Sequence, residues 1–199
     1  LNAINSTLLI PGFAFSRTYS DDLILPTHGY RVSVDLHGAD NLLFSDTTFL
    51  QAHLQSKLIL PVNDSTRILL RGEAGATAAK SFDELPVTQR FFAGGDQSVR
   101  GFEYNSLGPR DQFGNVLGGK DMVVGSFEID HFFGPVFGLD AFVDTGDVMN
   151  SFNTSFEKGV GAGLRWRTPV GMVRLDFAHP VKRPDLDRVR VHISIGPDL

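Results

Sequence analysis

The sequence predicts an all-β protein, and more narrowly a transmembrane antiparallel β-barrel, from three observations. Apolar and polar residues alternate along most of the chain, with almost no helical periodicity. Short and long connections alternate between the predicted strands, as in outer-membrane barrels. No apolar run approaches the roughly 18 to 20 residues that a spanning helix needs, which excludes a helical membrane protein. A soluble β-sandwich shows the same alternation, so alternation alone leaves both architectures open, and the connections favour the barrel.

Four strands are expected before the longest connection. The first, near residues 8–18, is blurred by Pro11 and Gly12. The other three follow from strict alternation, because successive side chains of a strand point to opposite sides. Their apolar faces comprise Tyr30, Val32, Val34 and Leu36, then Leu50, Ala52, Leu54 and Leu58, then Ile68, Leu70 and Ala74.

Five more strands are expected after it, which gives about nine in all. The first four have apolar faces formed by Val123, Phe127 and Ile129, by Phe137, Leu139, Ala141 and Val143, by Val160, Ala162, Leu164 and Trp166, and by Val173, Leu175 and Phe177. The last strand, at about 188–195, has the cleanest alternation, with Val189, Val191, Ile193 and Ile195 opposite Arg188, Arg190, His192 and Ser194.

The connections alternate in length. Tight links are expected at 62–65, 134–135 and 169–171, and long ones at about 39–47, 78–120, 147–157 and 180–187. The connection at about 20–29 breaks this contrast, because it is longer than a tight turn. The segment 78–120 is far longer than ordinary loops, which makes a working loop the natural interpretation.

The composition and the motifs give no indication of a catalytic, metal-binding or nucleic-acid-binding site. A net charge of -5 is too small to indicate nucleic acid as a partner, and the absence of cysteine excludes disulfides and thiolate metal sites. The histidines lack the spacing of a metal site, and neither a phosphate-binding loop nor a nucleophile elbow is present. We therefore expect no catalytic residues, no metal and no cofactor. The chain begins without a Met or a signal peptide, so we expect it to be a piece of a longer precursor.

The polar faces of the strands carry formal charge. In a closed barrel these side chains would point inward, and their mixed signs favour a wet lumen crossed by ion pairs over an ion-selective pore. The alternative for each is an ordinary solvated face. The residues are Arg67, Arg71, Glu73, Glu128, Asp130, Asp140, Asp144, Arg165, Arg167, Arg174 and Asp176.

Three ordered motifs carry a family resemblance. The stretch 90–102, RFFAGGDQSVRGF, resembles the lumen-inserted loop of the bacterial outer-membrane assembly and secretion barrels, a superfamily that includes BamA, TamA and the two-partner secretion transporters. The stretch 142–146, FVDTG, resembles the second hallmark, and the run GAGLR, PVG and RLDFAHP between residues 161 and 180 resembles the third. The ending SIGPDL resembles the TamA branch, and the connection LPTHGY at 25–30 resembles a periplasmic turn of the superfamily.

The resemblance implies a structure for the whole chain. Residues 1–199 would be the C-terminal part of one sixteen-stranded barrel, matching its eighth to sixteenth strands, without the N-terminal strands and the periplasmic transport domains. The loop at about 78–120 would insert into the lumen, where Arg100 would pair with Glu128 and Asp144 on the wall. Gly94, Gly95, Val99, Gly101 and Phe102 complete the loop motif, and Phe142 and Gly146 the wall motif.

The implied function is protein assembly in the bacterial outer membrane, without enzymatic activity. Autotransporter-type clients would be inserted or secreted through a lateral gate between the first and last strands, with a TamB-type periplasm-spanning partner. One lip of this gate would be formed by Arg188, Val189, Arg190, Val191, His192, Ile193, Ser194 and Ile195. The alternatives are a two-partner-type secretion pore and the barrel anchor of a patatin-like lipase fusion.

Overall fold

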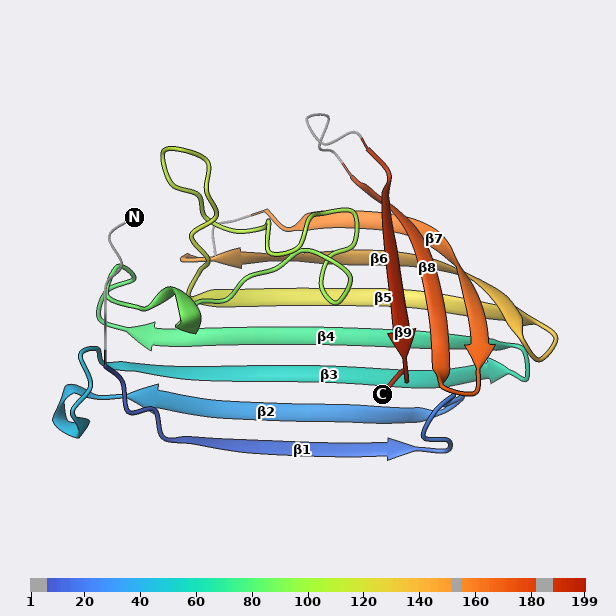
Figure 1. Ribbon diagram of the computed structural model, residues 1–199, viewed down its shortest axis with the longest axis horizontal. Coiled ribbons are helices and arrows are strands. Elements are labelled where there is room, and N and C mark those ends of the chain that lie inside the picture. The colour runs from blue at the N-terminus through green and yellow to red at the C-terminus, as the bar shows by residue number, and fades with distance from the viewer. Residues whose placement is uncertain (1–6, 152–154, 182–187) are drawn as a thin grey trace.

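The computed structural model describes residues 7–151, 155–181 and 188–199, and these residues form one curved antiparallel sheet (Figure 1). Its strands lie side by side in chain order. They are β1 (Gly12–Ser20), β2 (Gly29–Ala39), β3 (Phe49–Asn63), β4 (Thr66–Ala79), β5 (Asp121–Phe133), β6 (Phe137–Met149), β7 (Glu157–Thr168), β8 (Gly171–Pro180) and β9 (Arg190–Gly196). Two short 3-10 helices, η1 (Asn41–Leu43) and η2 (Val87–Gln89), lie in connections.

The predicted all-β fold with about nine strands is confirmed, with corrections at the strand ends. The first strand begins at Gly12 rather than near residue 8, directly after Pro11. The last begins at Arg190, so Arg188 and Val189 precede it. The pairing of Ala178 with Arg190 would place Arg188 opposite Pro180, which has no N–H to donate to the ladder.

The connections lie as a simple up-and-down meander requires. The long connections that follow β2, β4, β6 and β8 share one end of the sheet, and the tight turns share the other. The segments predicted at 147–157 and 180–187 run partly outside the described residues. The irregular turn between β1 and β2 is ordered by Asp21, whose carboxylate accepts hydrogen bonds from the backbone N–H groups of Thr27 and His28.

The two faces of the sheet differ in the way the alternation predicts. On the convex face large apolar side chains are exposed, including Phe127, Leu139 and Trp166. On the concave face the charged residues are buried, among them Arg67, Glu128, Asp130, Asp140, Asp144, Arg165 and Asp176. A soluble sandwich would bury the apolar face instead, so this arrangement excludes it and fits a barrel wall.

The main hydrophobic cluster lies between the concave face and the connection from β4 to β5. Loop residues Phe91, Val99 and Phe102 pack there with Met122 and Val124 of β5, together with Ala93, Leu107 and Val148. Within the described ranges, no helix is long and apolar enough to cross a membrane.

Candidate functional site

The segment from Lys80 to Lys120, here called the inner loop, lies over the concave face of the sheet (Figure 1). Three isolated β-bridges give it internal structure: Phe91 with Gly119, Ala93 with Leu107, and Arg110 with Val116. A turn at its tip is closed by hydrogen bonds from Gly94 N–H to the Ser98 hydroxyl and from Gly95 N–H to Val99 O. The inner loop therefore reaches the wall as an ordered element that presents Val99, Arg100 and Gly101.

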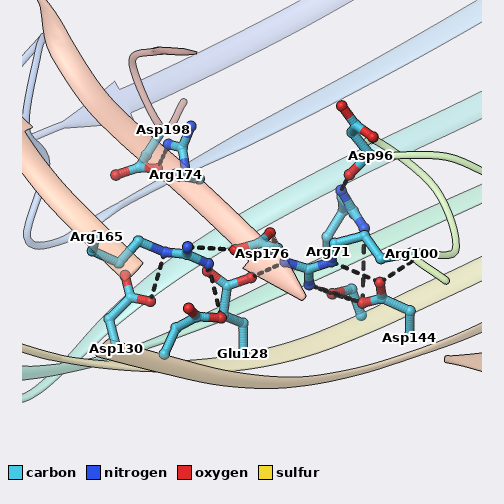
Figure 2. A network of polar contacts seen from close by, with 12 residues as sticks. Arg71, Asp96, Arg100, Glu128, Asp130, Asp144, Arg165, Arg174, Asp176 and Asp198 are labelled. Atoms are coloured by element: carbon cyan, nitrogen blue, oxygen red, sulfur yellow. Dashed lines mark hydrogen bonds and ion pairs between the residues drawn. The ribbon is translucent and has the colours of Figure 1, made fainter. Parts of the chain in front are cut away.

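Arg100 is almost completely buried and binds three carboxylates of the wall (Figure 2). Its Nε and Nη2 donate to the two oxygens of Asp144 at 2.8 and 3.0 Å, and its backbone N–H donates to Asp144 Oδ2 at 2.9 Å. Its Nη1 donates to Glu128 at 2.8 Å and to Asp176 at 2.9 Å. The guanidinium also lies over the ring of Phe142, 3.4 Å from the centroid. The planar fork of arginine makes this many-sided contact possible, whereas a lysine ammonium could not reproduce it.

A second arginine, Arg165 of β7, lies beside Arg100 and shares two of its carboxylates (Figure 2). It contacts Glu128 at 2.8 Å and Asp176 at 2.5 Å, and also Asp140 at 2.9 Å. Asp130 lies 3.4 Å from its Nε and binds Arg67 of β4 at 2.8 Å. The buried charges of the concave face thus form one continuous network in which each carboxylate has a cationic neighbour.

The network explains how so many charges can be buried. An isolated buried charge is very costly, and opposite charges at close range offset that cost. The Asp140 carboxylate and the Nε of Arg165 have such ion-pair neighbours, although they form no hydrogen bond. Burial by itself opposes the charged form of Arg100, but the bonds to Asp144 and the fields of Glu128 and Asp176 outweigh it and raise the pKa of the guanidinium above its ordinary value. Arg100 therefore remains a cation at every accessible pH.

Two glycines allow the inner loop to approach the wall closely. A Cβ on Gly159 of β7 would lie 1.9 Å from the carbonyl oxygen of Arg100, so the backbone of the inner loop rests on a bare stretch of β7. Gly101 has a φ of 95°, which favours glycine, and a Cβ there would lie 3.1 Å from the backbone of β8. Phe102 beyond it is 1% exposed.

The wall motif positions the partners of Arg100. Phe142 and Asp144 lie two residues apart on the concave face of β6. Gly146 continues this face opposite Val124, where an added Cβ would lie 2.6 Å from the Val123 carbonyl oxygen. The motif thus combines a carboxylate, a ring beneath the guanidinium and a tight strand contact.

The structure brings the last strand into contact with the inner loop. The Nε2 of His192 accepts a hydrogen bond from Gly101 N–H at 3.2 Å, and its Nδ1 contacts the Asp96 carboxylate. Arg190 pairs with Glu103 at 3.0 Å. Ser194 lies on the same face as these two residues, whereas Val191, Ile193 and Ile195 are exposed on the opposite face. Arg188 and Val189 lie before the strand.

Sequence reasoning placed Asp176 and Arg165 on the inner face but did not pair either with the network. It also gave no role to Asp198, which is 1% exposed and binds Arg67 at 2.8 Å. Asp198 also pairs with Arg174 on the inner wall (Figure 2). The residues after β9 therefore turn inward and bind β4 and β8. The only sequence signal was an acidic residue beside Pro197 beyond the last alternating strand.

Comparison with known proteins finds one family along the whole chain. The Omp85 superfamily domain matches residues 2–198. The outer membrane protein assembly factor BamA of Nitratidesulfovibrio vulgaris is 34% identical over 119 residues, which cover 56% of this chain and 15% of that protein. BamA of Neisseria meningitidis is 24% identical across 92% of this chain and 28% of its own length. A SAM50-like protein of Schizosaccharomyces pombe is 26% identical across 94% of this chain and 43% of its own length.

The fold has a solved counterpart. The crystal structure of BamA from Haemophilus ducreyi lacking POTRA domains 1-3 superposes with a TM-score of 0.75 at 22% identity, covering 92% of this chain and 40% of that one. The chain spans less than half the length of each curated relative described above.

Proposed function

Because the chain belongs to the Omp85 superfamily and is an outer-membrane β-barrel segment, we propose that it serves in an assembly factor that inserts or secretes client proteins. The matched relatives from Nitratidesulfovibrio vulgaris and Neisseria meningitidis are named assembly factors rather than enzymes. The observation that carries the proposal is the buried clamp of Arg100 on Glu128, Asp144 and Asp176, which holds an ordered loop against the inner wall beside the last strand.

We propose that residues 1–199 are the C-terminal part of a larger barrel. In lipid every backbone N–H and C=O must be paired within the protein, so a spanning sheet cannot keep two open edges. Within the described part of the chain, β1 pairs only with β2 and β9 only with β8. Further strands must close this sheet, which agrees with a sixteen-stranded barrel whose first strands are outside this sequence.

The free edge of β9 is the proposed lip of a lateral gate. An exposed strand edge presents a row of backbone donors and acceptors that another extended chain can pair with. A client strand would add to β9 in this way and then leave into the bilayer. The contacts of His192 with Gly101 and of Arg190 with Glu103 link this lip to the inner loop, so a movement of one is coupled to the other.

For the client class we propose autotransporter-type proteins, with a TamB-type periplasm-spanning partner. The support is the end of the sequence, residues 194–199, which resembles the TamA branch and which Asp198 anchors to the inner wall. A comparison of autotransporter insertion with general barrel insertion, in cells depleted of the full-length protein, tests this assignment. A selective defect in autotransporters is expected, whereas a general defect in all barrels would favour a BamA role.

A disulfide between β9 and the first strand of the full barrel tests the gate. Reconstituted full-length protein carrying one engineered cysteine on each of these strands should assemble clients when reduced and lose this activity when oxidised. The control is the same pair placed between β8 and β9, which are already paired and should tolerate the bond. Normal assembly by the locked barrel would refute a lateral gate.

A two-partner-type secretion pore is the second candidate, and it is favoured by the position of the inner loop. A loop over the concave face could act as a plug, with Arg100 as its fastening. In that case clients would cross through the lumen, and the locked barrel would still secrete them.

A further inference from the structure

Three cationic residues form a row across the concave face of β2, β3 and β4. Arg31 pairs in register with Lys57, and Lys57 pairs in register with Arg71, so the three lie directly opposite one another on adjacent strands. Like charges in such positions destabilise a sheet. The row therefore needs negative charge nearby.

Among the described residues, the carboxylates near the row are engaged by other groups, and Glu128 acts on Lys57 only through its field. The Asp96 carboxylate contacts His192. Glu128, Asp144, Asp176 and Asp198 are held by other arginines, and Glu73 accepts hydrogen bonds from His53 and Gln55. Arg71 donates to the backbone carbonyls of Asp96 and Ser98, and it is 3.9 Å from Asp144. Among the residues that the structure describes, the side chains of Lys57 and Arg31 have neither a hydrogen bond nor an ion pair.

A cavity of about 790 Å³ lies over this row. Its floor is the row itself on β2, β3 and β4, and its roof is the inner loop from Phe92 to Ser98. The residues after β9, including Asp198, form one side. Figure 1 shows the inner loop and the end of β9 on the same side of the sheet. The volume is typical of sites that enclose a ligand.

The stretch after β9 shows which chemistry this wall accepts. The Asp198 carboxylate is buried between Arg67 and Arg174 at the edge of the cavity, and the Leu199 side chain reaches Gly29 on β2. A peptide bearing a carboxylate is thus already bound here. A lipid phosphate fits less well, because its acyl chains need a continuous exposed apolar surface, and the large exposed apolar side chains of the strands lie on the opposite face of the sheet.

We propose that this cavity binds an acidic segment of a polypeptide, whose carboxylates pair with Lys57 and Arg31. The inference rests on the proposed function, since the polypeptide would be the client. It adds that acidic clients are retained on the inner wall before or during transfer, at a site separate from the clamp of Arg100.

The test measures binding of a fluorescent, extended peptide rich in aspartate to the full-length protein in nanodiscs. A peptide with asparagine at each aspartate is the matched probe. Lys57→Gln should weaken binding of the acidic peptide about tenfold or more, since each charge-assisted bond contributes that much. Lys57→Arg should retain it, and added salt should weaken it. Lys158→Gln removes the same charge from an exposed position on β7 and should leave binding unchanged.

Equal affinity for the aspartate and asparagine peptides, or equal loss in Lys57→Gln and Lys158→Gln, would overturn the proposal. Vesicles of anionic phospholipid that bind through Lys57, with no binding of the acidic peptide, would replace it with a lipid site. Client insertion by the unmodified protein is measured in parallel. Its failure would contradict the proposed function, whereas insertion without peptide binding would contradict only this inference.

Discussion

Replacing Arg100 by alanine should release the inner loop while leaving the sheet intact. The substitution removes side-chain bonds to Asp144, Glu128 and Asp176. Glu128 and Asp176 keep Arg165, but Asp144 keeps only hydrogen bonds from the Ser126 hydroxyl and the backbone N–H of residue 100, with Arg71 at 3.9 Å. Asp144 is therefore left as the poorly compensated buried charge.

The expected magnitude follows from this loss. Breaking a buried ion pair by removing one partner costs about 3–5 kcal/mol. The ratio of released to bound inner loop should then rise roughly 150-fold to 5,000-fold. Arg100→Lys keeps the charge but loses the fork, so it should give a smaller effect of about 1.5–3 kcal/mol.

Hydrogen exchange and limited proteolysis of the full-length protein measure this release. Protection of residues 90–110 should fall in Arg100→Ala, while β5 and β6 stay protected. Arg110→Ala is the matched control, because Arg110 is exposed and donates only to carbonyls within the inner loop. Unchanged exchange and cleavage of residues 90–110 in Arg100→Ala would refute the clamp as the element that holds the loop.

Three further predictions use the same exchange measurement. Gly159→Ala should displace the inner loop, because the new Cβ would lie 1.9 Å from the Arg100 carbonyl oxygen. Gly125→Ala is the control and should leave the loop in place, because its nearest contact is at 3.9 Å. Equal protection of the inner loop in both variants would contradict the close approach. Phe102→Ala should destabilise the bound inner loop by about 3–5 kcal/mol even with Arg100 in place, because Phe102 is 1% exposed. Phe113→Ala, at an 80% exposed position, is the control and should leave the protection of the inner loop unchanged. Burial opposes ionisation of Asp21, but hydrogen bonds from Thr27 and His28 outweigh it and lower the pKa of this carboxyl from 3.8. The turn after β1 should therefore keep its full protection from exchange above pH 3.8 and lose that protection as the pH falls further. Asp21→Asn should lack this acid-dependent loss, and a turn that loosens equally in both proteins would argue against Asp21.

Alternation was sufficient to predict the number of strands and most of their faces, because one face of nearly every strand is mainly apolar. The same alternation also predicted that Arg165 and Asp176 point inward. Their contacts with Glu128 and Arg100 did not follow from it. Glu128 lies on β5, which neighbours neither β7 nor β8, and Arg100 lies on the inner loop, whereas register relates only neighbouring strands. Curvature of the sheet brings these side chains together, and no local pattern encodes it.

The stretch after β9 was harder to predict for a different reason. Asp198 lies beyond the last alternating residue, where neither strand nor helix periodicity applies. Its burial depends on Arg67 of β4 and Arg174 of β8, both of which are distant from it in the sequence. The cationic row was equally hidden, because Arg31, Lys57 and Arg71 become neighbours only once the pairing register is known.

The carboxylates that Arg100 and Arg165 share also link strands of the wall that are not neighbours. On a flat sheet β5 and β8 would be about 14 Å apart, since neighbouring strands are spaced by about 4.8 Å. Yet Arg165 contacts Glu128 on β5 at 2.8 Å and Asp176 on β8 at 2.5 Å. The guanidinium groups therefore tie β5, β7 and β8 together on the concave side of the sheet. Flattening this part of the sheet would stretch several ion pairs at once, so the wall resists widening around Arg100 and Arg165. The strand β9 lies beyond these ion pairs and is therefore the part of the sheet that can move more easily.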